Sequence, residues 1–360
     1  MAFNPLRLSI ARQRRMLTKK LLAEKVGVAV HTITRIEQGG SDPKNETVSK
    51  IAEVLDYPRE FFFGSDLEIP SADLVSFRSQ RAMSAAERDA ALAAGAIGFE
   101  VSDWIEGLFD LPRVDIPDLN LFDPETAAVV LRQDWGIGEE PISNLVHLLE
   151  SKGVRVFSLA ENSLRVNAFS LWKNDKPFVF LNTKKTSESS RFDASHELGH
   201  LILHQDGGVT GREAEDQANR FASAFLMPKS SVISKISSIN SLNQIIQYKK
   251  LWKVSLLALV VRLHRLNRIS DWQYRDFCIQ IRVRYKNKEP NGIEREKSVV
   301  WDKVMKSLWA DRTTFRDIAT QLHLPDQEVS TLIFGMLHDF PDTPPVRGHS
   351  LALVKNDLIA

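Results

Sequence analysis

The spacing of apolar residues along the chain predicts a mainly α-helical protein with one small β-sheet. Most segments repeat apolar positions every three or four residues, as the buried face of a helix does. Clear examples of predicted helices are residues 84–109, 124–135, 142–151 and 187–204. Short runs rich in β-branched and aromatic residues predict strands at 154–159, 166–172 and 177–182. The turn at 173–176 joins the last two strands into a hairpin that directly precedes helix 187–204.

Residues 1–65 form predicted helices joined by short loops. Thr18 is a suitable N-cap for a second helix at 19–25, and a tight turn at 27–29 leads into a third helix at 30–38. Gly39 then provides a C-terminal stop. Helix, glycine turn and helix follow the spacing of a helix-turn-helix, whose second helix enters the DNA major groove.

The third predicted helix exposes side chains that can hydrogen-bond to bases and phosphates: His31, Thr32, Thr34, Arg35 and Gln38. Over residues 1–64, eleven Lys and Arg stand against seven Asp and Glu, which gives a local net charge of +4. This charge favours contact with the phosphates of double-stranded DNA. The alternative is a small helical bundle with no role in DNA binding.

The same segment resembles the Xre (Cro/cI-like) repressor domain in two runs, Leu22-Ala23-Glu24-Lys25-Val26-Gly27-Val28 and Ile36-Glu37-Gln38-Gly39. The resemblance implies a DNA-binding helix-turn-helix bundle. One position departs from the family, which usually has Gln at the start of the second helix, where this chain has Lys19. Lys19 can still meet a phosphate, but only as a point charge. We therefore expect a different operator sequence or weaker base readout.

The predicted helix 187–204 contains the motif His-Glu-x-x-His at residues 196–200. Positions i and i+4 lie on one face of a helix, so His196 and His200 can present two imidazoles to one metal ion. Glu197 lies beside them, where it can reach a water, as in the zincin arrangement of two His ligands and a general base. A chance match is the alternative. The apolar flanks argue against it, because buried polar groups are costly unless they are paired or metal-bound.

A third ligand has to come from elsewhere in the chain. The single cysteine, Cys278, excludes a cysteine-rich zinc site. A following helix, at about 212–227, offers three acidic candidates: Glu213, Glu215 and Asp216. Glu215 shares a helical face with Asn219 and Ala222. His204 extends the series on the first helix, but it lies about 12 Å along the axis from His196 at 1.5 Å per residue. We therefore expect His204 to support the site rather than to bind the metal.

Two separated motifs resemble the ImmA/IrrE family of metallopeptidases. The first is the His196–His200 motif with His204, and the second comprises Glu215-Asp216-Gln217-Ala218-Asn219-Arg220-Phe221-Ala222 and Phe225-Leu226-Met227-Pro228. The resemblance covers roughly residues 120–270 and places the family's ligand carboxylate on Glu215. It implies a zinc endopeptidase that acts together with Xre repressors, which characterised members cleave. The expected cofactor is Zn²⁺ held by His196, His200 and Glu215, with Glu197 as the catalytic base.

These assignments divide the chain into four predicted parts: a DNA-binding domain (1–65), a linker with connecting helices (66–118), a zincin-like α+β peptidase domain (119–270) and a helical C-terminal region (271–360). The connecting helices could hold domains together or form a homodimer. The basic residues Arg262, His264, Arg265 and Arg268 are expected to form a solvated face. Residues 71–81 read as a linker, and the tail from Pro341 as flexible.

Residues 314–335 repeat the helix-turn-helix pattern of 18–39. The second helix of this repeat carries Asp326, Gln327 and Glu328, which suit phosphate poorly. We therefore expect it to contact protein rather than DNA.

Composition limits the kinds of partner and the cellular location that the chain can have. At 360 residues, 43% hydrophobic and with a net charge of +1, the chain can bury large cores, and any basic patch must be local. No apolar run is long enough for a bilayer, and the first residues lack the apolar core of a signal peptide. We expect a cytoplasmic protein with no membrane partner.

Two functions follow from these patterns. The first is a DNA-binding regulator whose zinc endopeptidase controls expression by limited proteolysis of a repressor, a toxin or its own helix-turn-helix. The alternative is a DNA-binding repressor or antitoxin-like regulator whose metal domain senses or binds without cleaving. A generic degradative protease is disfavoured by the DNA-binding segment.

Overall fold

The computed structural model describes residues 2–71, 76–77, 83–159, 168–205, 209–286 and 288–336. Most of the predicted linker at 71–81, the first residues of strand 166–172 and the predicted helix break at 206–208 lie outside the described residues. The predicted flexible tail from Pro341 lies wholly outside them. Within the described residues, no helix is both long and apolar enough to cross a membrane.

The N-terminal helices are α1 (Pro5–Arg14), α2 (Lys19–Val26), α3 (Val30–Glu37) and α4 (Asn45–Leu55), followed by the 3₁₀ turn η1 (Arg59–Phe63). Among them, α2 and α3 form within one residue of the predicted bounds 19–25 and 30–38. The Thr18 side chain accepts a hydrogen bond from the Leu21 N–H and so caps α2. Gly27 ends α2 in the left-handed conformation, with φ of 78°. Local signals therefore define the helix-turn-helix.

The sheet contains the predicted hairpin and one added strand. Its strands are β1 (Ser76–Phe77), β2 (Arg155–Leu159), β3 (Ala168–Lys173) and β4 (Lys176–Asn182), in the order β1-β3-β4-β2. β3 and β4 pair antiparallel around Asn174 and Asp175, which both have positive φ, as the tight hairpin turn requires. β2 pairs parallel to β4, and β1 pairs antiparallel to β3.

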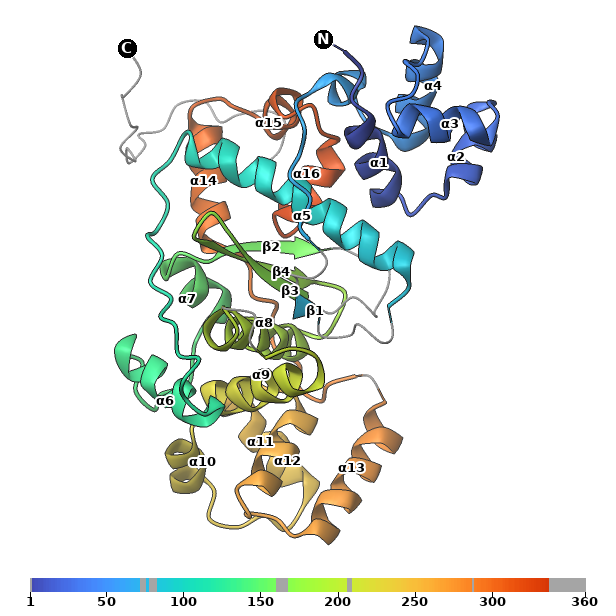
Figure 1. Cartoon of the computed structure of the whole chain (residues 1–360). Coiled ribbons are helices and arrows are strands. Elements are labelled where there is room, and N and C mark those ends of the chain that lie inside the picture. Colours follow the sequence, from blue (N-terminus) through green and yellow to red (C-terminus); the bar gives the residue numbers. More distant parts are fainter. Residues whose placement is uncertain are drawn as a thin grey trace.

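The sheet lies between helices on both faces (Figure 1). On one side the long helix α5 (Ala85–Glu106) covers a row of strand phenylalanines, including Phe157, Phe178 and Phe180. On the other side Val179 and Leu181 pack with the core around α8 (Ser187–Leu203) and α9 (Gly211–Leu226). The alternation of side chains along each strand thus separates two apolar cores.

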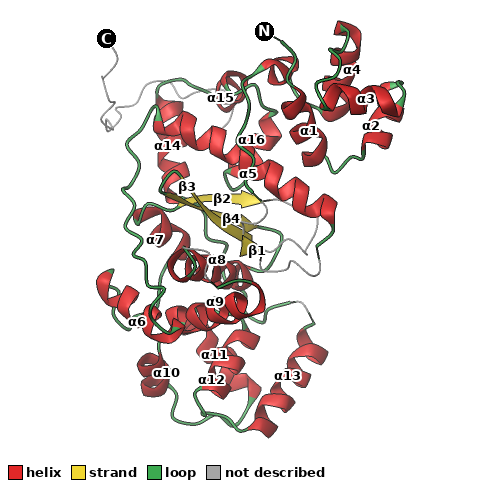
Figure 2. Ribbon diagram, in the orientation of Figure 1, coloured by secondary structure: helices red, strands yellow, loops and turns green. Residues whose placement is uncertain are grey.

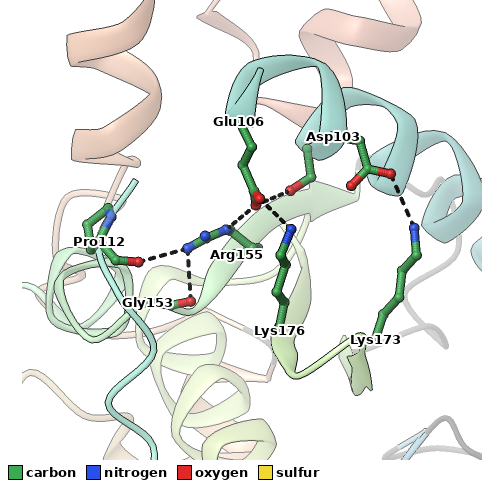
Figure 3. A network of polar contacts seen from close by, with 8 residues as sticks. Asp103, Glu106, Pro112, Gly153, Arg155, Lys173 and Lys176 are labelled. Carbon is green, nitrogen blue, oxygen red and sulfur yellow. Dashed lines mark hydrogen bonds and ion pairs between the residues drawn. The ribbon is translucent and has the colours of Figure 1, made fainter. Parts of the chain in front are cut away.

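Gly98 lets α5 approach the sheet closely. A Cβ added there would lie 2.7 Å from the Phe180 ring. Polar contacts then fix the C-terminal end of α5 to the sheet (Figure 3). The Glu106 carboxylate accepts hydrogen bonds from Arg155 at 2.8 Å and from Lys176, and Lys173 reaches Asp103 at 3.4 Å. Partial burial alone would raise the pKa of Glu106, but the two cations outweigh it and lower that pKa.

The remaining elements are helical, as Figure 2 shows. They are α6 (Pro124–Asp134), α7 (Leu145–Ser151), α10 (Lys229–Lys235), α11 (Leu242–Trp252), α12 (Leu256–Arg265), α13 (Asp271–Tyr285), α14 (Val299–Ala310), α15 (Phe315–Gln321) and α16 (Asp326–Leu332). The mainly helical fold with a small sheet, predicted from the sequence, is confirmed.

The prediction of a solvated basic face on α12 is wrong for Arg262. Its side chain is 1% exposed, pairs with Glu125 at 3.1 Å and donates a hydrogen bond to the Met227 carbonyl at 3.0 Å. That carbonyl follows the last residue of α9, where helix carbonyls lack partners within the helix. Burial lowers the pKa of Arg262, and Glu125 counteracts that effect. The arginine therefore ties α12 to α9 and α6.

The C-terminal hairpin contacts the DNA-binding bundle. The Glu328 carboxylate on α16 pairs with Arg14 at 2.5 Å and with Arg15 at 3.1 Å, both at the C-terminal end of α1. The Glu328 side chain is only 3% exposed. A second link joins Arg7 of α1 to Glu100 of α5 at 2.7 Å. The bundle is therefore held against α5 and α16 by charge pairs.

We expect Glu328→Ala to loosen this attachment by about 3 kcal/mol, because removing one partner leaves buried arginine charge poorly compensated. Amide hydrogen exchange of α1 measures the effect. Asp326→Ala is the matched control on the same helix, because Asp326 is exposed and lies 3.9 Å from Arg316. Equal α1 exchange in both variants would contradict the assignment.

Candidate metal centre and DNA-binding surface

Helix α8 carries the predicted metal-binding motif in the interior of the protein. Thr186 caps the helix by accepting a hydrogen bond from the Ser189 N–H. His196 and Glu197 are 0% exposed, and His200 is 7% exposed. The Nε2 atoms of His196 and His200 lie 3.1 Å apart, so the two imidazoles converge as the i, i+4 spacing predicts.

Helix α9 brings Glu215 to the two histidines. Its carboxylate oxygens lie 3.5 Å from the His196 Nε2 and 3.5 Å from the His200 Nε2. The close packing of the two helices depends on Gly199 inside the motif. A Cβ at Gly199 would lie 3.0 Å from the Phe221 ring and 3.2 Å from the Ala218 Cα. A larger residue there would push Glu215 away from the imidazoles.

The other two acidic candidates lie elsewhere. Glu213 and Asp216 are exposed on α9, whereas Glu215 is half-buried beside the histidines. Within the part of the chain that the structure describes, His196, His200 and Glu215 form a group whose ligand atoms all lie within 4.8 Å of one another. Burial alone would raise the pKa of Glu215. Hydrogen bonds and charge from His196 and His200 outweigh that effect and lower the pKa to about 2.

The three ligand atoms fit a tetrahedral cation. Metal–ligand distances of about 2.0–2.1 Å place neighbouring ligands of a tetrahedral zinc ion roughly 3.4 Å apart. The two imidazole nitrogens lie 3.1 Å apart, and each lies 3.5 Å from a different oxygen of the Glu215 carboxylate, which is close to that edge length. Two imidazole nitrogens and one carboxylate are also a donor set that zinc and other divalent ions accept.

Glu197, the predicted base, faces strand β3. One of its carboxylate oxygens accepts a hydrogen bond of 2.7 Å from the Ser170 hydroxyl. Ser170 is buried in the middle of β3. Ser170 is not among the predicted site residues, although it lies within the predicted strand 166–172 that precedes the motif. The contact fixes the orientation of the carboxylate beside the candidate metal ligands.

His204 supports His200 from the next turn of the helix. The Nδ1 atoms of the two rings lie 2.9 Å apart, and the His204 Nε2 lies 3.0 Å from the Gln217 side-chain oxygen. Burial lowers the pKa of His204, which favours the neutral ring. The Gln217 oxygen can only accept, so a neutral His204 that donates to it carries its proton on Nε2 and can accept from His200 at Nδ1. In that tautomer, the His200 Nε2, which lies 3.5 Å from Glu215, carries the lone pair that a metal ion needs.

We expect His204→Ala to lower the affinity for zinc by about 10- to 100-fold, because groups that orient metal ligands typically contribute that much. Competition against a coloured chelator measures the affinity. His264→Ala is the control, because His264 pairs with Asp271 at the surface. Unchanged zinc affinity in the His204 variant would refute the supporting role.

Helix α3 presents the predicted DNA-contacting side chains. His31, Arg35 and Gln38 are exposed, and Thr32 and Thr34 are partly exposed. Lys19 is 38% exposed at the start of α2 and pairs with Glu37 at 3.1 Å, a carboxylate that Arg12 also holds. The ion pair ties the Lys19 ammonium to the end of α3.

Both regions match known protein families. Residues 8–62 match the family model described as helix-turn-helix, and residues 149–264 match the model described as the IrrE N-terminal-like domain, a peptidase family. The chain joins a helix-turn-helix domain to an IrrE-like domain. This finding confirms both resemblances drawn from the sequence. No curated protein matches the chain.

The matched ranges agree with the geometry. The helix-turn-helix match spans α2 and α3, and the IrrE-like match contains β2, β3, β4 and the helices α8 and α9. The protein is therefore a DNA-binding regulator with a metallopeptidase-like domain. The residues that would bind metal or DNA stay predictions, and so do the domain bounds and the homodimer.

Proposed function

We propose that the protein is a DNA-binding transcriptional regulator that hydrolyses peptide bonds in a partner protein with a divalent metal, expected to be Zn²⁺. The observation that carries the proposal is the convergence of His196, His200 and Glu215 beside a buried Glu197. A purely structural metal site would not need a carboxylate at that position.

The chain's own residues take distinct parts in this reaction. His196, His200 and Glu215 would hold the ion, and His204 would fix the tautomer of His200. The bound ion would supply Lewis-acid chemistry, which polarises a peptide carbonyl and makes water a better nucleophile. Glu197 would accept the proton of the attacking water and deliver it to the leaving amine. Ser170 would orient the Glu197 carboxylate through its 2.7 Å hydrogen bond.

The test compares zinc-loaded and metal-free protein on a library of peptides from a proteome digest. Mass spectrometry reads out new peptide N-termini. We expect new N-termini only with the zinc-loaded protein, and their loss after the chelator EDTA is added. A zinc-loaded chain that produces none would favour the alternative function, in which the metal domain senses or binds without cleaving.

The DNA-binding part of the proposal has its own test. We expect Arg35→Ala to weaken binding to an operator duplex selected from a random pool. It should also reduce the slope of log affinity against log salt by about 0.9 if Arg35 meets a phosphate. Arg88→Ala, which removes a half-exposed arginine on α5, is the control. Equal operator affinity for both variants would remove Arg35 from the DNA interface.

A further inference from the structure

Strand β3 borders the candidate metal centre on one side of the sheet. Its residue Ser170 donates a hydrogen bond to Glu197, and the Trp172 indole donates to the Leu201 carbonyl of α8 at 3.2 Å. β3 pairs with β4 along one edge and with β1 along the other. In the pairing with β1, Ser76 lies opposite Ser170, and Phe77 lies opposite Phe169. β1 therefore covers the edge of the strand that holds the candidate base (Figure 1).

β1 does not belong to the IrrE-like domain. That match begins at residue 149, whereas β1 lies at 76–77, in the connector between the DNA-binding bundle and α5. Among its described residues, the matched domain by itself contains β2, β3 and β4, and β3 is an edge strand of that sheet. An edge strand presents unpaired backbone donors and acceptors, which another extended chain can pair with.

We propose that β1 is an autoinhibitory occupant of the β3 edge, because it pairs with Phe169 and Ser170 where an extended polypeptide would otherwise pair as an antiparallel strand. The docked peptide would pair with Phe169 and Ser170 and so pass beside Glu197. Backbone hydrogen bonds would provide the affinity for the peptide. Every second side chain of the peptide would face the protein and set the sequence preference. This inference rests on the proposed peptidase function, because it names how that substrate binds.

The contact between β1 and β3 suits a displaceable occupant. Among the residues that the structure describes, the ladder comprises two residue pairs, which is short. The connector nevertheless holds β1 next to the edge at an effective concentration on the order of millimolar, which competes with a free peptide. A partner would bind when β1 is displaced, and β1 is attached through the chain to the DNA-binding bundle. The edge is therefore placed to respond to movement of that bundle.

The test measures binding of a fluorescently labelled peptide with the sequence of residues 71–83 to the full-length zinc-loaded chain. All proteins carry Glu197→Gln, so that no peptide is cut. The displaced variant adds Ser76→Pro and Phe77→Pro, because proline cannot donate to a strand ladder. The matched control instead adds Ser71→Pro, which places a proline in the connector outside β1. Zinc binding and circular dichroism verify that each variant is folded.

Fluorescence anisotropy should show the peptide binding at least ten-fold more tightly to the displaced variant than to the other two proteins. A peptide N-methylated at alternate amides keeps its side chains, loses backbone donors and should not bind. Equal affinity for all three proteins, no binding to the displaced variant, or equal binding of the methylated peptide would each overturn the docking surface. Because the assay uses binding alone, a chain that passes it yet cleaves nothing would contradict only the proposed function.

Discussion

Replacing Glu215 with Gln is expected to lower the affinity of the chain for Zn²⁺ by more than about 100-fold, since even residues that only support metal ligands contribute about 10- to 100-fold. The carboxylate lies 3.5 Å from both imidazole nitrogens, and the low pKa of Glu215 keeps it ionised. Glutamine keeps the shape of the side chain but removes the charge that a cation needs. Isothermal titration calorimetry measures the affinity and the number of ions bound.

Glu213→Gln is the matched control on the same helix. Glu213 is exposed and lies one turn from Gln217, with which it shares a 3.5 Å hydrogen bond. We expect this variant to bind one zinc ion as the unaltered chain does. A large loss in the Glu213 variant and none in the Glu215 variant would exchange the two assignments, which the sequence alone left open.

Replacing Glu197 with Gln is expected to slow peptide hydrolysis by about 10²- to 10⁴-fold, the usual contribution of a general acid–base. The amide cannot accept the proton of the attacking water at neutral pH. Zinc affinity should stay close to that of the unaltered chain, because Glu197 is not among the three predicted ligands. The rate is measured on the most rapidly cleaved peptide of the library.

A second variant separates the base from its support. Ser170→Ala removes the 2.7 Å hydrogen bond to Glu197 but keeps the carboxylate. Its rate should fall less than that of the Glu197 variant, because the carboxylate that accepts the proton is still present. If the Glu197 variant cleaves as fast as the unaltered chain, the assigned base is wrong.

Features encoded within one element were predictable from the sequence. The facing pair His196 and His200 follows from helical spacing alone, and the helix-turn-helix follows from its cap at Thr18 and its turn at Gly27. The β3–β4 hairpin follows from the turn at 173–176. The third ligand could not be assigned from spacing alone, because spacing allowed Glu213, Glu215 and Asp216. The family resemblance selected Glu215.

Features that join distant segments were not predictable. The connector at 71–81 is polar and mixed, so its sequence does not reveal that Ser76 and Phe77 pair with β3. The helical position of Arg262 predicts an exposed basic side chain. The side chain is buried instead, because it binds the Met227 carbonyl at the end of α9 and the Glu125 carboxylate. Local periodicity shows which face of a helix is apolar. It does not show which distant polar group will form a hydrogen bond or an ion pair with a residue on that helix.

The C-terminal repeat shows the same limit. Its acidic second helix was expected to contact protein, and Glu328 in fact pairs with Arg14 and Arg15 of the DNA-binding bundle. The acidic residues of α16 thus indicated that this helix would not bind DNA. Its actual partner, the end of α1, became known only from the fold. The division of the chain at residues 65, 118 and 270 stays a prediction.

The central claim is that one chain couples DNA binding to proteolysis, and a reporter assay tests it most directly. The reporter gene is placed under the operator selected by the unaltered chain. It is expressed together with either the unaltered chain or its Glu197→Gln variant, at equal protein levels in the native host. The account predicts that both proteins occupy the operator equally, and that the reporter changes under inducing conditions only with the unaltered chain. Identical reporter output with both proteins under every condition would contradict it.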